Sequence, residues 1–438
     1  MAKKDYYSLH LPKTEKPRIV IIGGGFSGIE MAKKLKNQDV QVVLLDRHNY
    51  HTFIPLLYQV ATAGLEPDSI AEPLRKIIED HKDFYFRLAK VDFIDPECNK
   101  IITEIGELSY DFLIIASGSR TNYFGNEAMF KKAFPLKRIT QALDLRSHVL
   151  QNLEKAVLSD DEEEIQKYMN IVIVGGGATG VEMAGAFGEL KNYVLPKDYP
   201  ELDFNNMNIY LVEGLSQLLS GMSNHASKKA QRYLTKFGVN VLINTKVKSY
   251  DGEEVYFDNG TRIPTGTLIW AAGVQGNLID GLKESSIERS RILVDEYNKV
   301  LGYDNIFAVG DLALMKTKKY PKGHAMLAPV AIQQGKLLAE NLINYINGKK
   351  LTPFTYFDKG LMATIGRKKA VVDLPGGIKF GGFLAWLTWM FVHILYLIGF
   401  RNKLVVFSNW VWNYFTYDRG IRLIIRPFDM EKKTIDVD

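Results

Sequence analysis

Residues 19–46, IVIIGGGFSGIEMAKKLKNQDVQVVLLD, decide how this chain folds. An apolar run at Ile19 to Ile22 leads into the turn GGGFSG, a helical pattern follows, and a second apolar run ends on Asp46. This order predicts a strand, a glycine turn, a helix and a strand that stops on an acid able to accept hydrogen bonds from a ribose. The stretch therefore predicts a dinucleotide-binding unit.

The residues of the glycine turn have separate tasks. Gly23 permits the tight turn, Gly25 lets a pyrophosphate approach the backbone, and Gly28 lets the helix pack closely on the strand. Phe26 and Ser27 lie in the same turn and are further candidate cofactor contacts.

The same pattern recurs at residues 171–180, IVIVGGGATG, and a later strand, IYLVE, ends on Glu213. Its turn glycines are Gly175, Gly177 and Gly180. Two complete fingerprints imply two dinucleotides, and a protein that binds two usually passes electrons between them. A carboxylate at the ribose position binds a 2′-hydroxyl and repels a 2′-phosphate, so Glu213 predicts NADH over NADPH.

Composition narrows the class of protein. With 438 residues, of which 46% are hydrophobic, the chain can form two or three domains and is not intrinsically disordered. Its one cysteine, Cys98, excludes flavoenzymes that use a redox-active cysteine pair. The net charge of +5 is concentrated in residues 376–426, unlike the charge of a uniformly basic nucleic-acid binder. Residues 1–18 lack a signal sequence and predict a short disordered lead and a cytoplasmic location.

Small residues end two further strands. Ser117 and Gly118 follow the apolar run before them, and Ala272 and Gly273 follow the run TLIW. Small side chains leave room for a ring system, although a tight strand exit explains them equally well.

Two later positions are candidates for flavin contacts. Asp311 ends the strand NIFAVGD and is either a helix cap, a surface acid or a hydrogen-bond partner of a flavin ribitol. A helix begins near Ala328, and its free N–H groups could face a flavin ring.

Other polar features are not predicted to form sites. His48 and His51 lack a partner at metal-ligand spacing, so they are interpreted as surface or packing histidines and no metal is predicted. The acidic run at residues 160–164 is interpreted as a solvated loop.

The tail is apolar and aromatic. Residues 383–400, FLAWLTWMFVHILYLIGF, carry no formal charge, and a run of this length is near the lower limit for spanning a bilayer. Four of the five tryptophans lie in this tail, where they and the basic residues suit the headgroup level. The alternatives are a single span, a pair of helices lying in the membrane plane, and a buried dimer interface. We favour the in-plane pair because aromatic and basic residues continue past the first apolar block.

Together with the AxxAxQ stretch at residues 328–333, these features resemble the type II NADH dehydrogenases, the single-subunit, non-pumping NADH:quinone oxidoreductases. The resemblance implies an α/β fold with two nested Rossmann-like dinucleotide-binding domains and C-terminal amphipathic membrane-anchoring helices. It also implies FAD as cofactor, NADH and a quinone as substrates, the lipid surface as a partner, and a homodimer on the cytoplasmic face of the inner membrane. The implied segments are 15–150 and 289–376 for FAD, 165–288 for NADH and 377–438 for the membrane anchor.

Residue roles follow from the same resemblance. Glu182 would lie near the nicotinamide and the flavin, although an acid in the first turn of a helix is also common. Gln333 matches the second glutamine of the quinone motif, but Pro329 replaces the first. Lys379 is either a cation near the route by which the quinone enters or a solvated lysine. The implied cofactor contacts are Gly23, Gly25, Phe26, Ser27, Gly28, Asp46, Ser117, Gly118, Asp311 and Ala328 for FAD, and Gly175, Gly177, Thr179, Gly180, Glu182, Glu213, Ala272 and Gly273 for NADH.

The resulting prediction is hydride transfer from nicotinamide C4 to flavin N5, followed by delivery of two electrons and two protons to a quinone under the tail helices. One rival is a flavoprotein reductase with a soluble acceptor of the ferredoxin or rubredoxin type. Another is a membrane-docked NADH sensor that binds NADH without rapid turnover.

Overall fold

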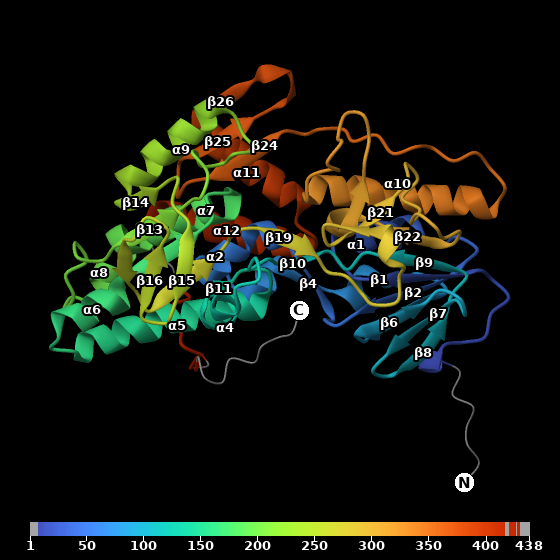
Figure 1. Ribbon diagram of the computed structural model, residues 1–438, viewed down its shortest axis with the longest axis horizontal. Coiled ribbons are helices and arrows are strands. Elements are labelled where there is room, and N and C mark those ends of the chain that lie inside the picture. The colour runs from blue at the N-terminus through green and yellow to red at the C-terminus, as the bar shows by residue number, and fades with distance from the viewer. Residues whose placement is uncertain (1–7, 417–419, 426, 430–438) are drawn as a thin grey trace, which may run out of the picture.

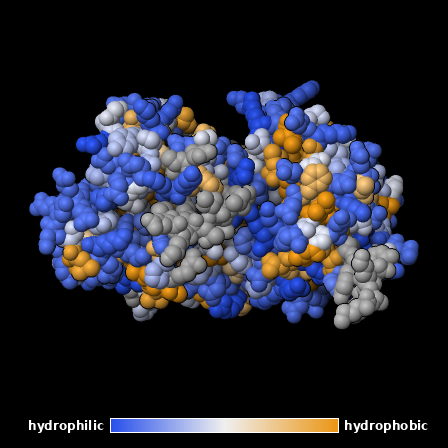
Figure 2. Space-filling view, turned by 60° about the horizontal axis from the view of Figure 1, so that its bottom comes forward, coloured by the Kyte–Doolittle hydropathy of each residue, from blue (hydrophilic) through white to orange (hydrophobic). Residues whose placement is uncertain are grey.

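The computed structural model describes residues 8–416, 420–425 and 427–429. It has two lobes, each built on a five-stranded parallel sheet (Figure 1), and the surface is hollowed between the lobes (Figure 2). The first sheet has the order β22-β9-β1-β2-β5 and the second the order β11-β18-β12-β13-β14. The strands of the first sheet are β1 (Arg18–Ile22), β2 (Gln41–Asp46), β5 (Phe84–Leu88), β9 (Phe112–Ile115) and β22 (Ile306–Ala308). Those of the second are β11 (Phe134–Pro135), β12 (Ile171–Val174), β13 (Ile209–Val212), β14 (Val239–Leu242) and β18 (Thr267–Trp270).

The first lobe is interrupted by the second. Strand β22 follows the whole second sheet in the chain, yet it pairs with β9 in the first sheet. Helix α10 (Ala328–Ile346) also returns to pack on α1 (Phe26–Lys34), and a Cβ on Gly335 would come within 2.5 Å of the Ser27 carbonyl oxygen. The predicted nested arrangement of two Rossmann-like units is confirmed.

The central strands are buried because helices cover one face of each parallel sheet and a smaller antiparallel sheet packs on the other face. Strand β12 is buried along its whole length, as expected for a parallel strand with an unbroken apolar run. The remaining helices are α2 (Leu57–Ala61), α3 (Leu74–Ile77), α4 (Glu127–Lys132), α5 (Ile139–Leu158), α6 (Glu162–Met169), α7 (Ala178–Glu189), α8 (Leu195–Asp198), α9 (Asn224–Lys236), α11 (Phe383–Tyr396) and α12 (Phe400–Thr416).

Smaller sheets surround the two parallel ones. The sheet β24-β25-β26 contacts α7, α9 and α11, so it packs with the second lobe and the tail. The strands of these sheets are β3 (Tyr50–Thr52) with β4 (Ala71–Pro73); β6 (Val91–Asp95), β7 (Lys100–Thr103) and β8 (Gly106–Ser109); β10 (Ser119–Thr121) with β19 (Val274–Gly276); β15 (Val247–Tyr250), β16 (Glu254–Phe257) and β17 (Arg262–Pro264); β20 (Ile287–Glu288), β21 (Arg291–Val294) and β23 (Ala313–Met315); and β24 (Leu361–Thr364), β25 (Ala370–Asp373) and β26 (Lys379–Gly382).

The predicted disordered lead is wrong for its described part. Leu9 and Leu11 are buried in the apolar cluster that contains β1 and β9, so burial of their side chains orders this segment. Residues 1–7 of that prediction lie outside the described residues.

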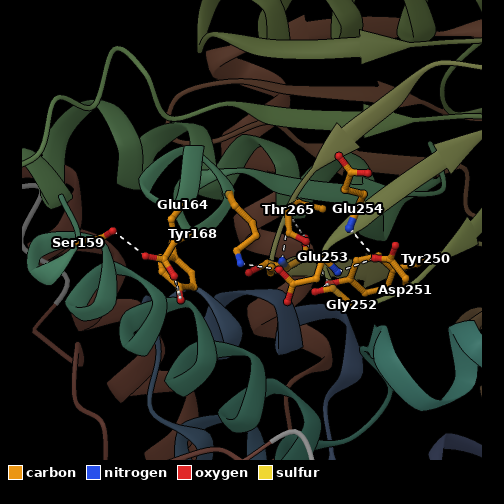
Figure 3. Close-up of polar contacts among 12 residues, drawn as sticks. Ser159, Glu164, Tyr168, Tyr250, Asp251, Gly252, Glu253, Glu254 and Thr265 are labelled. Carbon is orange, nitrogen blue, oxygen red and sulfur yellow. Dashed lines mark hydrogen bonds and ion pairs between the residues drawn. The ribbon is translucent and has the colours of Figure 1, made fainter. Parts of the chain in front are cut away.

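The acidic run was also misassigned to a loop. Asp161 caps α6 by accepting a hydrogen bond from the Glu163 N–H at 2.9 Å, and the acids that follow form the first helical turn. Within that helix Glu164 accepts hydrogen bonds from the hydroxyls of Ser159 and Tyr168 (Figure 3). Acids at this end of a helix are stabilised by its dipole, which a count of charges alone does not reveal.

The tail forms two helices, because Gly399, with φ +85°, turns the chain between α11 and α12. Within the described part of the chain, no helix has both the length and the apolar character needed to cross a membrane. Trp386, Trp389 and Trp410 are buried, so the prediction that the tail tryptophans lie at headgroup level is wrong for these three, while Trp412 is exposed. Two of the basic residues that were expected to accompany the tryptophans at headgroup level, Arg419 and Arg426, lie outside the described residues.

Polar contacts fix the tail to the first lobe. The Asn402 amide donates to the Glu72 carboxylate at 2.9 Å and to the Ala71 carbonyl at 3.0 Å. The Trp410 indole N–H donates to the Gln59 side chain at 2.8 Å. The tail is therefore part of the folded core and not a separate appendage.

Candidate functional site

The first glycine turn has room for a phosphate against its backbone. Gly23 has φ +109°, and a Cβ on Gly28 would come within 1.9 Å of the Gly23 carbonyl oxygen, so both positions require glycine. A Cβ on Gly25 would meet nothing within 4 Å. Phe26 and Ser27 begin α1, whose free N–H groups point out of this turn.

The second turn repeats this geometry. Gly175 has φ +109°, a Cβ on Gly180 would come within 1.8 Å of the Gly175 carbonyl oxygen, and the space around Gly177 is open. Thr179 is exposed in the first turn of α7. The chain therefore contains two turns of the same construction.

An acid stands beside each turn. Asp46, the last residue of β2, accepts the Gly24 N–H at 2.7 Å, and Glu213, directly after β13, accepts the Gly176 N–H at 2.6 Å. These bonds hold each carboxylate at the carboxyl end of its sheet, where a ribose can reach it.

Further predicted contacts surround the first turn. Asp311 accepts a hydrogen bond from the Ser119 hydroxyl at 2.6 Å. Gly310, beside it, would place a Cβ 2.7 Å from the Ser27 hydroxyl, so Asp311 lies near the first glycine turn. Gly118 has φ +70° and open space around it, and Ala328 begins α10. The Ser117 hydroxyl instead donates to the Asn277 carbonyl at 2.7 Å. Open glycine backbones, two carboxylates and a helix N-terminus are a donor and acceptor set that fits FAD.

Glu182 is a buried residue of α7. The Thr364 N–H donates to its Oε1 at 3.3 Å, and burial raises the pKa of this carboxyl to about 8, against opposing effects of that N–H and of the Trp389 indole. The carboxyl is therefore protonated at neutral pH. Sequence reasoning missed Thr364 and Trp389 because they come from β24 and α11, far along the chain.

Gln333 and Lys379 lie in different parts of the molecule. Both polar atoms of the Gln333 amide bond to the Phe357 backbone at 2.9 Å. Lys379 is exposed and starts β26, in a hairpin that stands away from α10 (Figure 1). Their predicted quinone roles remain predictions.

Sequence reasoning also missed His393, although a single histidine in an uncharged run was a signal. Its ring stacks on Trp389 with centroids 4.0 Å apart, and its Nδ1 lies 2.7 Å from the Trp389 carbonyl. Burial lowers the pKa of His393 to about 4, so the ring is neutral. His51, by contrast, packs near the first turn with its Nδ1 3.0 Å from the Gly24 carbonyl.

A pocket that is partly open to solvent lies where α2, α7 and the tail helices meet. Trp386, Trp389 and Trp410 line it, and Thr364 places it beside Glu182. An apolar molecule arriving along the tail would thus come close to the protonated carboxyl.

Comparison with known proteins defines the class. The family of pyridine nucleotide-disulphide oxidoreductases matches residues 17–335, which contain both turns, and the NDH2 C-terminal domain matches residues 359–417. The chain therefore has the two-nucleotide fold of that class. Because the chain has one cysteine, a disulphide within the chain has no part in its chemistry.

Relatives define the family. The chain is 35% identical over 422 residues to the type II NADH:quinone oxidoreductase Ndh of Mycobacterium tuberculosis, covering 92% of this chain and 89% of that protein. The type II NADH:quinone oxidoreductase NdhA of the same organism is 34% identical over 421 residues, covering 92% of this chain and 88% of that protein. The chain belongs to the type II NADH:quinone oxidoreductases.

Solved structures share the fold. NDH2 from Plasmodium falciparum in complex with NADH matches with a TM-score of 0.87 at 23% identity, covering 94% of this chain and 100% of that one. The sulfide:quinone oxidoreductase of Aquifex aeolicus matches with a TM-score of 0.68 at 19% identity, covering 91% and 95%.

Proposed function

We propose that this chain is an FAD-dependent NADH:quinone oxidoreductase that does not pump ions, and that its two glycine turns divide the nucleotides between them. The observation that carries the proposal is the repeated turn, each copy with an acid at the next strand. Residues 15–150 and 289–376 would hold FAD and residues 165–288 NADH. Bound FAD supplies a carrier that accepts a hydride from NADH and passes two electrons to a quinone.

The chain's own residues position the reactants. Glu213 would hold the adenosine ribose of NADH and disfavour a 2′-phosphate, and Asp46 would do the same for the ribose of FAD. Asp311, held by the Ser119 hydroxyl, would fix the ribitol. Glu182 can hold a proton on Oε2, since Oε1 accepts the Thr364 N–H, and quinone reduction consumes protons.

Two half-reactions test this function. Purified, detergent-solubilised protein should be yellow, lose flavin absorbance in stopped flow on mixing with NADH, and recover it on addition of a short-chain quinone. A ferredoxin-type acceptor should not replace the quinone. Protein that is colourless and cannot be reconstituted with FAD would contradict the proposal, and binding of NADH without turnover would favour the sensor.

The tail would rest in the membrane plane. Apolar side chains remain exposed on both of its helices although three of its four tryptophans are buried. Those on α11 include Leu384, Phe391 and Leu395, and those on α12 include Phe400, Phe407 and Phe415. Such a surface matches the boundary between headgroups and acyl chains, from which a quinone can enter.

We place the enzyme on the cytoplasmic face of the inner membrane, where dissolved NADH reaches it, and expect a homodimer, as the family resemblance implies. Accessibility to protease in oriented membrane vesicles tests the first, and light scattering of the detergent-solubilised protein tests the second.

A further inference from the structure

The loop after β10 holds an aromatic ring in a strained position. Phe124 has φ +52°, a backbone conformation that is costly for a bulky L-residue, and its side chain is 69% exposed. Burial of the ring does not compensate for this strain. Strained residues that persist often serve a site.

Two hydrogen bonds fix this loop to the end of β18, and a third lies within the loop. The Trp270 indole N–H donates to the Asn122 carbonyl at 2.9 Å, and the Asn122 N–H donates to the Gly273 carbonyl at 3.3 Å. The Phe124 N–H donates to the Asn122 side chain at 2.8 Å. The ring is therefore held in place although it faces solvent.

The ring stands directly over Gly273. A Cβ on Gly273 would come within 2.8 Å of the Phe124 Cζ, and Gly273 has φ +84°. The same strand end touches the second glycine turn, since a Cβ on Gly175 would lie 2.7 Å from the Ala271 carbonyl carbon. Phe124 thus lies beside the proposed NADH site.

The strand order of the second sheet indicates which half of NADH Phe124 would contact. Strand β12, which leads into the turn, lies between β13 and β18. Glu213, the acid for the adenosine ribose, follows β13, so the adenosine half of NADH lies on the β13 side of β12. The pyrophosphate crosses the glycine turn at the end of β12, and the nicotinamide half therefore extends over β18, on the other side. Phe124 is at that end.

We propose that Phe124 is a substrate-contact residue whose ring covers the nicotinamide half of NADH and excludes water from it, an inference that rests on the proposed function. An aromatic contact of this kind corresponds to about three- to tenfold in affinity. It would hold the nicotinamide without touching the adenosine half.

Equilibrium titration tests this with NAD⁺, which does not reduce the protein, and with ADP, which carries only the adenosine half. Phe124→Ala should raise the Kd for NAD⁺ about three- to tenfold and leave the Kd for ADP unchanged. Phe124→Tyr should behave as the wild type, and so should Phe93→Ala, which removes an exposed ring from β6. In turnover, the KM for NADH should rise while the KM for quinone stays constant.

Phe124→Gly separates binding from folding. Glycine adopts positive φ freely, so this variant should melt no lower than the wild type. It should nevertheless bind NAD⁺ more weakly than the wild type does, because the ring is absent. If the wild type binds both NAD⁺ and ADP, then NAD⁺ affinity that is unchanged in both the alanine and the glycine variant would overturn the inference. A wild type that binds neither ligand would instead overturn the proposed function and this inference with it.

Discussion

Glu182 is a carboxyl whose environment keeps it neutral. Glu182→Gln retains the size and the acceptor of the side chain but cannot release a proton, so we expect slower turnover with quinone while FAD stays bound. Steady-state rates and the flavin-to-protein ratio measure this. Turnover equal to that of the wild type would remove Glu182 from the mechanism.

The same carboxyl links stability to pH. Its folded pKa of about 8 exceeds the usual 4.5, so the unfolded chain releases this proton first. Its contribution to stability is full below pH 4.5 and is lost as the pH rises towards about 8, by up to about 1.4 kcal/mol per pH unit. Glu182→Gln should flatten this fall. Melting temperatures of both proteins between about pH 5 and about pH 8 test this prediction, and parallel curves would contradict it.

The amide of the Gln333 side chain donates one hydrogen bond to the Phe357 backbone and accepts another from it. Gln333→Ala should raise the quinone KM with little change in flavin reduction by NADH, which stopped flow measures separately. Asn341, on the same helix, makes the same pair of bonds to the Thr352 backbone, at 2.8 and 2.9 Å. Asn341→Ala is thus a matched control that should lose stability without changing the quinone KM. A defect confined to flavin reduction in Gln333→Ala would refute the assignment.

At the scale of elements, each tail helix has an inner face that packs on the protein and an outer face that is exposed. Their inner faces carry buried tryptophans and Asn402, and their outer faces carry exposed apolar side chains. Truncation after Gly377 would therefore remove part of the core together with the membrane surface. Point substitutions on the outer face separate the two effects.

Leu384→Asp should weaken binding to lipid vesicles by about tenfold or more, because it removes about 2 kcal/mol of apolar burial and adds a charge. Flavin reduction by NADH in detergent should not change. Leu158→Asp, at an even more exposed leucine at the end of α5, should bind vesicles like the wild type. Sedimentation with vesicles measures both variants, and equal binding by all three proteins would exclude α11 from the membrane surface.

At the scale of the molecule, one apolar core joins the tail to the second lobe and to α2 of the first. The cluster contains Leu57 of α2, Phe187 of α7 and Trp389 of α11. Loss of any part should destabilise the rest.

Trp389→Ala should therefore cost about 3–5 kcal/mol and lower the melting temperature in a single transition, with loss of helical structure and release of flavin together. Circular dichroism and flavin fluorescence follow the two events. Trp412→Ala, which truncates an exposed tryptophan of the same tail, should have little effect. A tail that melts separately while flavin stays bound would contradict this continuity.

Local signals were sufficient for much of this protein. The nucleotide turns could be predicted because each depends on contacts within a few residues: Gly23 with Gly28, and Gly175 with Gly180. The paired acids could be predicted because each ends the apolar run of a strand that follows its glycine turn. The lead and the acidic run were misassigned because composition does not report burial of Leu9 or the capping role of Asp161.

The sequence by itself determined the two nucleotide-binding units and an apolar tail, because periodicity and glycine spacing are properties of neighbouring residues. The return of the chain to the first sheet was implied by the family resemblance. Only the tertiary structure decided that the tail tryptophans turn inward, that Trp389 and Thr364 enclose Glu182, and that Phe124 stands over Gly273. Each of these pairs residues far apart in the chain, and burial, which sets the pKa of Glu182, exists only once such segments pack together.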